Sequence, residues 1–251
     1  MRRLFDAWPS CSLVPVLLMV AGCGTSEYEN RLNTHGIAAA RLEEQKAIFN
    51  KRLYGPDKIY AGDADSPTIR LPLEVAAQFA KGAADSDFGN QPISANEWSV
   101  PNMELPAQRV CWRGYKLTSI GTNAPLYVYL CQQKVGKGTP LIDAVNAQLP
   151  KAFPGKPATW TDESYITEDG VSQIAWKRLQ IKGDMTFGTP PMGEETQPGT
   201  LELLYHTSNG WEVLVGFRFM DSLEESIQVS TILVPAVCGS LQVPAPPAPA
   251  G

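Results

Sequence analysis

The sequence predicts an α+β fold in which a long N-terminal helix is followed by a mostly antiparallel sheet packed on helices. Residues 26–53 contain no proline and are rich in Ala, Glu, Arg and Leu, which predicts the helix. Between residues 108 and 242, runs of β-branched and aromatic residues alternate with turn-rich gaps, which predicts hairpins. The chain has 251 residues, of which 43% are hydrophobic. Folding can therefore bury roughly 70% of the surface that the unfolded chain exposes.

The first 22 residues have the layout of a secretory signal peptide. Arg2 and Arg3 precede an apolar run at 13–21, which is shorter than the roughly 20 residues that span a bilayer. The run ends in Val20-Ala21-Gly22-Cys23, which resembles the lipobox of bacterial lipoproteins. The resemblance implies that the signal is cut before Cys23, which then carries a diacylglycerol and a further acyl chain such as palmitate. The alternative is an ordinary secreted protein with a chance cysteine after its signal.

A lipidated Cys23 implies a protein that its acyl chains hold at a membrane of the cell envelope. Each buried CH₂ group contributes roughly 0.8 kcal/mol, so two or more chains make the anchor effectively permanent. Gly24 and Thr25 stand where many lipoproteins of the inner membrane have an aspartate. We therefore expect the outer membrane, with the protein facing the periplasm. Arg2-Arg3-Leu4-Phe5 also resembles part of a twin-arginine signal, but without the usual polar lead-in, so general secretion is expected.

Residues 23–54 are expected to form the lipid anchor and a helical stalk. One set of positions recurs alternately four and three residues apart, as in a coiled coil. The set consists of Tyr28, Leu32, His35, Ala39, Leu42, Lys46, Phe49 and Leu53. A helix over 26–53 would be about 40 Å long, and its stripe either forms a stalk or lies against the rest of the chain. Gly55-Pro56 ends the helix, and His35 is expected to pack rather than to bind a ligand.

Residues 55–107 form a loop-rich segment in which two short elements are expected. Residues 68–71 have the composition of a strand, and residues 73–81 that of a short helix with Pro72 at its start. The rest of the segment is expected to consist of turns.

Residues 109–117 and 125–133 predict a hairpin at the start of the globular domain. If its turn is centred on Gly121, Cys111 lies opposite Cys131. Because an exported protein meets an oxidising compartment, this placement predicts a disulfide between the two cysteines. A turn shifted by one residue would put the two sulfur atoms on opposite faces and leave two small buried side chains.

The rest of the globular domain, residues 108–242, is expected to add strands and two helices. Thr139-Pro140 caps a helix that runs to about Phe153. Strands follow at 158–165, 172–187, 200–206 and 211–219, with a tight turn at Ser208-Asn209-Gly210. Ser222-x-x-Glu225 is a capping box that opens a final helix, which Pro235 kinks or restarts. We expect helices on one face of the sheet, followed by a Pro/Ala-rich tail over 243–251.

Two resemblances bear on fold and family. The order of helices and strands is similar in outline to that of Mog1/PsbP-like domains. Several short motifs resemble uncharacterised planctomycete-type lipoproteins. These motifs are Cys23 with Tyr28-Glu29-x-Arg31-Leu32, Ile69-Arg70-Leu71-Pro72, Trp176-Lys177-x-Leu179 and Gly210-Trp211-x-Val213-Leu214-Val215-Gly216-Phe217-Arg218. The second resemblance covers most of the chain after Cys23 and implies no activity.

Charge and motif spacing argue against several kinds of activity. Lys+Arg 21 against Asp+Glu 26 gives a net charge of −5 without a block of like charges, so nucleic-acid binding is not expected. The two histidines, His35 and His206, have no metal-ligand spacing, so neither a metal nor a cofactor is expected. Some short matches to known sites are expected to be turns. They are Asp87-Phe88-Gly89, Gly136-Lys137-Gly138-Thr139, Asp63-x-Asp65 and Asp85-x-Asp87.

Two functions remain open, and neither has a catalytic residue that the sequence identifies. The first is a non-catalytic envelope lipoprotein whose globular domain binds an envelope protein or cell-wall component, or has a structural role. The second is an envelope hydrolase built from scattered carboxylates and one histidine. A pocket that gathers Asp or Glu side chains with His206 would favour the hydrolase. An exposed aromatic patch would favour binding. No enzymatic activity is expected, and the oligomeric state is left open.

Overall fold

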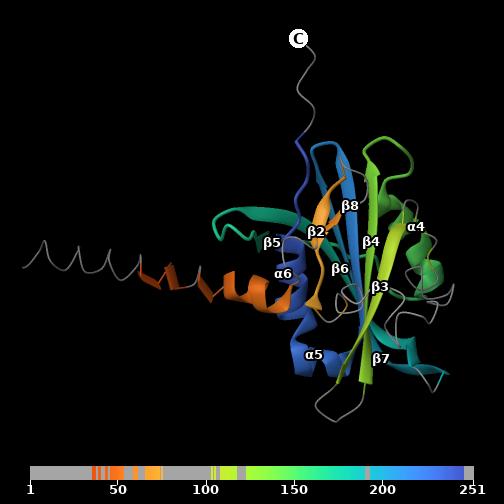
Figure 1. Cartoon of the computed structure of the whole chain (residues 1–251). Helices are drawn as coiled ribbons and strands as arrows, with labels where there is room; N and C mark the ends of the chain where they lie inside the picture. The colour runs from red at the N-terminus through yellow and green to blue at the C-terminus, as the bar shows by residue number, and fades with distance from the viewer. Residues whose placement is uncertain are drawn as a thin grey trace, which may run out of the picture. The chain divides into compact units, whose positions relative to one another are not determined.

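The computed structural model describes residues 36–37, 39–40, 43–44, 46–53, 59–61, 66–73, 75, 103, 105, 108–117, 123–189 and 193–245. The chain divides into two compact units, Met1–Gln45 and Lys46–Gly251. In the first unit the described residues are helical. The sheets and the labelled helices belong to the second unit, which we call the body (Figure 1).

Six antiparallel strands form the main sheet of the body. They are β3 (Gln108–Leu117), β4 (Asn123–Lys134), β5 (Thr161–Ile166), β6 (Gln173–Thr189), β7 (Gly193–Ser208) and β8 (Trp211–Met220). Their order across the sheet is β3-β4-β8-β7-β6-β5, and every neighbouring pair is antiparallel. A separate pair joins β1 (Ile59–Ala61) to β2 (Thr68–Arg70), the strand expected at 68–71. The predicted α+β class with an antiparallel sheet is confirmed.

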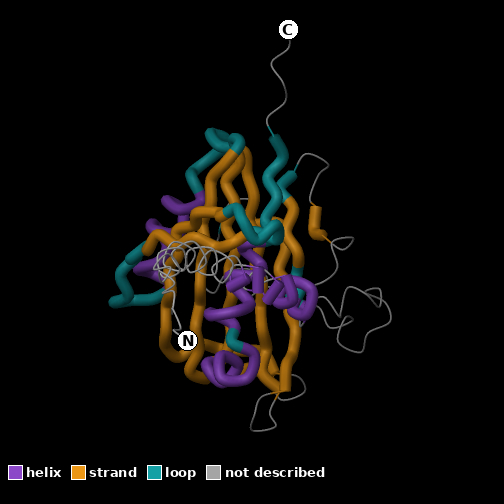
Figure 2. The backbone as a smooth tube through the Cα atoms, turned by 90° about the vertical axis from the view of Figure 1, so that its left-hand side faces the viewer, coloured by secondary structure: helices purple, strands orange, loops and turns teal. Residues whose placement is uncertain are grey.

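Helices cover both faces of the main sheet, and the expectation of one covered face is wrong. α4 (Leu141–Ala152) lies on one face, which we call the α4 face. The other face carries α5 (Asp221–Ile227), η2 (Val229–Leu233) and α6 (Val234–Gly239) (Figure 1). Viewed from that side, helical segments cross in front of the strands (Figure 2).

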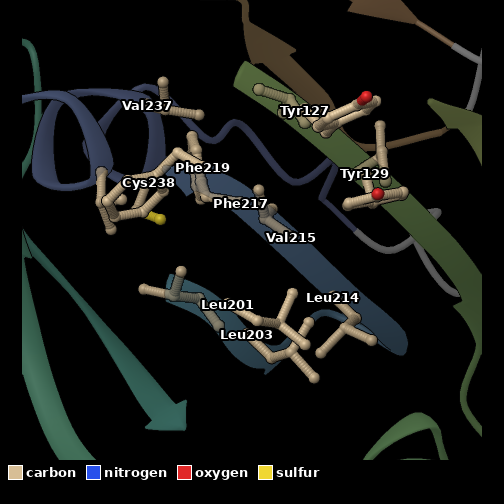
Figure 3. Close-up of a cluster of buried hydrophobic side chains, with 14 of the residues drawn as sticks. Tyr127, Tyr129, Leu201, Leu203, Leu214, Val215, Phe217, Phe219, Val237 and Cys238 are labelled. Carbon is tan, nitrogen blue, oxygen red and sulfur yellow. The ribbon is translucent and has the colours of Figure 1, made fainter. Parts of the chain in front are cut away.

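Helices are needed on both faces of the sheet because its central strands are buried on both sides. Residues 124–133 of β4 and 212–220 of β8 are all buried, so both strands need apolar cover on each side. On the face of α6, Phe217 and Phe219 lie beside Val237 and Cys238 (Figure 3). A continuous apolar run, rather than strict alternation, is the sequence pattern of such a strand.

α4 begins with a cap that differs from the predicted one. Its buried residues include Leu141, as expected, but Pro140 occupies the cap position without a side-chain hydrogen bond, so Thr139-Pro140 does not cap the helix through a side chain. Instead Oε2 of Glu212, on β8, accepts the Leu141 backbone N–H at 2.7 Å and Gln133 Nε2 at 3.0 Å. A buried strand carboxylate thus satisfies a backbone donor at the helix start.

The final helix is broken at Gln228, seven residues before Pro235, and is not opened by the predicted capping box. α5 begins at Asp221 behind Met220, which still pairs with Gly199, so Ser222 lies inside the helix and cannot be its cap. The chain then breaks at Gln228, whose φ is 55°, and passes through a π-helical segment. η2 continues directly into α6, which has Pro235 in its first turn, so the helix changes from π to α type there and the break lies at Gln228 instead.

The β3–β4 hairpin is confirmed, but its predicted register is wrong. Cys111 lies opposite Tyr129, and Cys131 lies opposite Gln108 next to a bulge. The pairs are centred on position 120 rather than on Gly121, because a turn-rich gap does not specify its own central residue. The predicted Cys111–Cys131 disulfide rested on the two cysteines lying opposite each other, and in the structure they do not.

The segments before β3 join the same core. Residues 46–52 are helical, and Phe49 and Leu53 are buried, which is the C-terminal end of the helix expected over 26–53. The loop-rich segment contributes further core residues, namely Ile69, Leu71, Val75, Met103 and Leu105. Leu73 and Val75 are helical at the start of the helix expected over 73–81. The structure also describes helical residues at 36–37, 39–40 and 43–44. The rest of both predicted helices lies outside the described part of the chain, as do residues 246–251 of the tail.

β6 and β7 continue past the end of β8 as a two-stranded ribbon, which we define as residues 184–189 of β6 and 193–198 of β7. β7 pairs with β8 only as far as Gly199, which also lies opposite Gly183 of β6. Met185 and Phe187 of the ribbon are nevertheless buried. The ring of Phe187 lies 6.4 Å from that of Tyr127 on β4, so the ribbon folds back against the α4 face.

Candidate functional site

Arg218 of β8 is a charged side chain inside the core of the body. It lies opposite Tyr127 of β4 and Leu201 of β7 on the α4 face, and it is 4% exposed. Its guanidinium carbon lies 4.0 Å from the centroid of the Tyr127 ring and 5.5 Å from that of Phe187. We call these three residues the arginine site.

Two glycines make room for the aromatic rings around this arginine. A Cβ atom at Gly199 would lie 2.6 Å from Cζ of Phe187, so the ring can lie there only over a glycine. A Cβ atom at Gly216 would lie 3.2 Å from Cδ2 of Tyr129, whose ring stacks against that of Tyr127 with a centroid distance of 6.4 Å. Gly199 and Gly216 therefore leave the space that the aromatic rings in and beside the arginine site occupy.

The guanidinium of Arg218 has no carboxylate partner among the described residues. Its Nε and Nη2 atoms are buried and make no hydrogen bond in this part of the chain. Two other arginines of the body do meet carboxylates. Nη1 of Arg70 lies 2.7 Å from Glu168, and Nη2 of Arg178 lies 2.9 Å from Glu202. The fold thus pairs these two arginines but leaves Arg218 with aromatic neighbours.

Aromatic contact offsets only part of the cost of burying this charge. A desolvated cation–π contact contributes about 2 kcal/mol. Removing an ion from water costs several kcal/mol, and each buried donor without a partner adds about 1 to 3 kcal/mol. An anion at Arg218 would supply both the opposite charge and the missing acceptor atoms.

A second polar cluster lies on the opposite face, where Glu202 of β7 meets η2. Oε1 of Glu202 accepts hydrogen bonds from three side chains, those of Arg178, Gln180 and Ser230. Burial raises the pKa of the nearby Cys238 thiol, so this cysteine stays protonated at neutral pH. The cluster links the sheet to the helical layer and presents no thiolate.

His206, the histidine that a hydrolase would need, lies on the same face of β7 as Glu202, four residues further along the strand. Its Nδ1 lies 2.7 Å from the carbonyl oxygen of Ala175, and its Nε2 lies 2.8 Å from Oγ of Ser208. Its ring lies 5.2 Å from that of Trp176, and burial lowers its pKa. Both ring nitrogens therefore contact groups other than carboxylates.

The remaining residues from the sequence analysis form no common site in the described part of the chain. Gly136-Lys137-Gly138-Thr139 lies between β4 and α4, where the Thr139 carbonyl accepts from Gln133 Nε2. Other candidates lie outside the described residues, namely Cys23, His35, Asp63-x-Asp65, Asp85-x-Asp87 and Asp87-Phe88-Gly89.

The described residues contain neither a cluster of metal ligands nor a helix that could span a membrane. Among these residues, no group of three or more His, Cys, Asp or Glu side chains is placed to hold a metal ion. Within the same part of the chain, none of the helices combines the length and the apolar character that a membrane crossing requires.

Sequence reasoning did not single out Arg218. The residue closes the motif Gly216-Phe217-Arg218, and in an alternating strand it would point to solvent. The signal that could have identified it is the near-continuous apolar run from Trp211 to Phe219, which indicates a strand buried on both faces. A charged side chain inside such a strand is itself an unusual observation.

Comparisons with known proteins add no relative. No protein-family model matches the chain, and a search of curated proteins found no similar sequence. The resemblances to planctomycete-type lipoproteins and to Mog1/PsbP-like domains remain expectations from the sequence.

Proposed function

We propose that this protein is a bacterial lipoprotein anchored in the cell envelope, whose body is a non-catalytic binding or structural module. The observation that carries the proposal is Val20-Ala21-Gly22-Cys23, placed directly after a leader with two arginines and a short apolar run. Acyl chains on Cys23 would hold the protein on the membrane without a membrane-spanning segment. Gly24 and Thr25 favour the outer membrane, with the body facing the periplasm.

The surroundings of His206 and Arg218 in the described part of the body favour binding over catalysis. His206 has no carboxylate among its hydrogen-bond partners there, so the observation that would favour a hydrolase is missing from these residues. Arg218 instead offers hydrogen-bond donors without an acceptor. The proposed partner is an envelope protein or a cell-wall component.

Metabolic labelling with a fatty-acid probe tests the anchor. The native chain should be labelled, and Cys23→Ser should lose the label because the acceptor thiol is gone. Cys11→Ser is the matched control, since Cys11 lies in the leader upstream of the lipobox and its loss should leave labelling intact. Equal labelling of the native chain and Cys23→Ser would overturn the proposal.

A further inference from the structure

The geometry points to the arginine site as a binding site for an oxyanion, a carboxylate or a phosphate group that presents two oxygen atoms to Arg218. This inference rests on the proposed binding role and names the chemical class of its ligand. It is carried by the burial of Arg218, by its contacts with Tyr127 and Phe187, and by its two donors that have no partner among the described residues.

The two donors without partners are the pair that matches a bidentate anion. In a guanidinium, Nε–H and one N–H of Nη2 point in the same direction and form one edge of the planar group. Carboxylate and phosphate oxygens accept two parallel hydrogen bonds from such an edge. In Arg218 both atoms of this edge are buried and make no hydrogen bond among the described residues.

The aromatic neighbours leave that edge available. A cation–π contact uses the flat face of the guanidinium, whereas its N–H bonds lie in the plane of the group. The distance of 4.0 Å from the guanidinium carbon to the Tyr127 ring centroid is that of such a face contact. Tyr127 and Phe187 therefore orient the guanidinium and lower the local polarity, which strengthens a hydrogen bond to an anion.

Three carboxylates, on β8, on the ribbon and at the start of α5, accept hydrogen bonds from groups other than Arg218. Glu212 is on the same face of β8 but six residues away, about 20 Å along the strand, and it accepts hydrogen bonds from Leu141 and Gln133. Glu195 on the ribbon is exposed and accepts from Gln197. Asp221 accepts from Thr200, whose side chain lies on the opposite face.

The ribbon supplies a route by which a ligand reaches the buried edge. Phe187 covers the site from a part of β6 that lies beyond the last pairing between β7 and β8. Among the described strands, the ribbon pairs only within itself, so it can move without breaking a hydrogen bond of the central sheet. The Gly183 and Gly199 pair marks the point where this movement would occur.

Thermal unfolding of the full-length chain in detergent, with acetate or inorganic phosphate added at matched ionic strength, tests the site. A ligand at ten times its dissociation constant should raise Tm by about 3 to 6 °C. Arg218→Met and Arg218→Lys should raise the dissociation constant of the anion that stabilises the native chain at least tenfold, because both variants lose the guanidinium edge. Lys182→Met is the matched control, since Lys182 is an exposed cation on β6, and it should keep the native response.

The unliganded variants supply a second readout. Arg218→Met removes a buried charge that has no partner among the described residues, so its Tm without anions should equal or exceed that of the native chain. A Tm lower by about 6 °C or more would show that Arg218 has a structural partner within the chain, and would overturn the inference. An equal response of Arg218→Met and the native chain, or no response to either anion, would also overturn it.

The two anions separate the ligand classes. A response to acetate alone supports a carboxylate ligand, a response to phosphate alone supports a phosphate ligand, and a response to both supports the site in general. A chain that is labelled by the fatty-acid probe but responds to neither anion would refute the arginine site and leave the proposed anchor standing.

Discussion

Among the glycines of the described residues, Gly239 of α6 is the one where an added methyl group would make the closest contact. A Cβ atom there would lie 2.2 Å from the carbonyl oxygen of Ile166 on β5 and 3.1 Å from Cζ of Phe49. Because real Cβ contacts do not fall below 3.0 Å, α6 and β5 would have to separate by roughly 1 Å. The nearest obstacle is backbone and cannot rotate away, so Gly239→Ala should cost about 3 kcal/mol, the upper end for overpacking.

Thermal unfolding gives the measurement for Gly239→Ala. For a body of this size, about 3 kcal/mol corresponds to a Tm lower by about 6 to 12 °C. Gly183→Ala is the matched control, because a Cβ atom at Gly183 would meet nothing within 4 Å and the backbone needs no positive φ. Its Tm should stay within about 2 °C of the native value. If Gly239→Ala unfolds within that same window, the close packing of α6 on β5 is wrong.

Three further predictions concern the ribbon, the cap of α4 and the buried histidine. Gly199→Ala should cost about 1 to 3 kcal/mol in urea unfolding, because its Cβ would strike the Phe187 ring; no loss would contradict the packing of the ribbon. Glu212→Ala should cost about 1 to 2 kcal/mol, whereas Glu212→Gln, which keeps one acceptor oxygen for Leu141, should lose less; equal losses would contradict the cap. Burial lowers the pKa of His206 below its usual 6.5, so the folded state binds fewer protons and stability should fall as the pH drops below about 6.5. His206→Gln should reduce this loss between about pH 7.5 and 5.5, and an unchanged pH dependence would refute it.

The strands were predictable because their residue composition differs sharply from that of the gaps between them. Every strand expected between 109 and 219 is present, and the turn at Asn209 and Gly210 has the positive φ angles, 49° and 75°, that its sequence predicts. The register of the first hairpin was not predictable, because several residues of its turn-rich gap could serve as the centre. A shift of that centre from 121 to 120 moved Cys111 from Cys131 to Tyr129.

The site residues depend on contacts that only the folded chain supplies. Glu212 and Arg218 stand on one face of a strand that a simple alternation would expose to water. Both are buried because α4 and the ribbon, which come from distant parts of the sequence, cover that face. The cap of α4 likewise comes from β8, 71 residues away, so no local motif could have identified it.

The anion site can be observed most directly at the Nε–H group of Arg218. In a chain labelled with ¹⁵N-arginine, the Nε–H resonance of Arg218 is identified as the one that Arg218→Lys removes. Acetate or phosphate should shift that resonance progressively to saturation and slow its exchange with water, because Nε then donates to the anion. A resonance that stays in place while either anion is raised to saturating concentration would contradict the account.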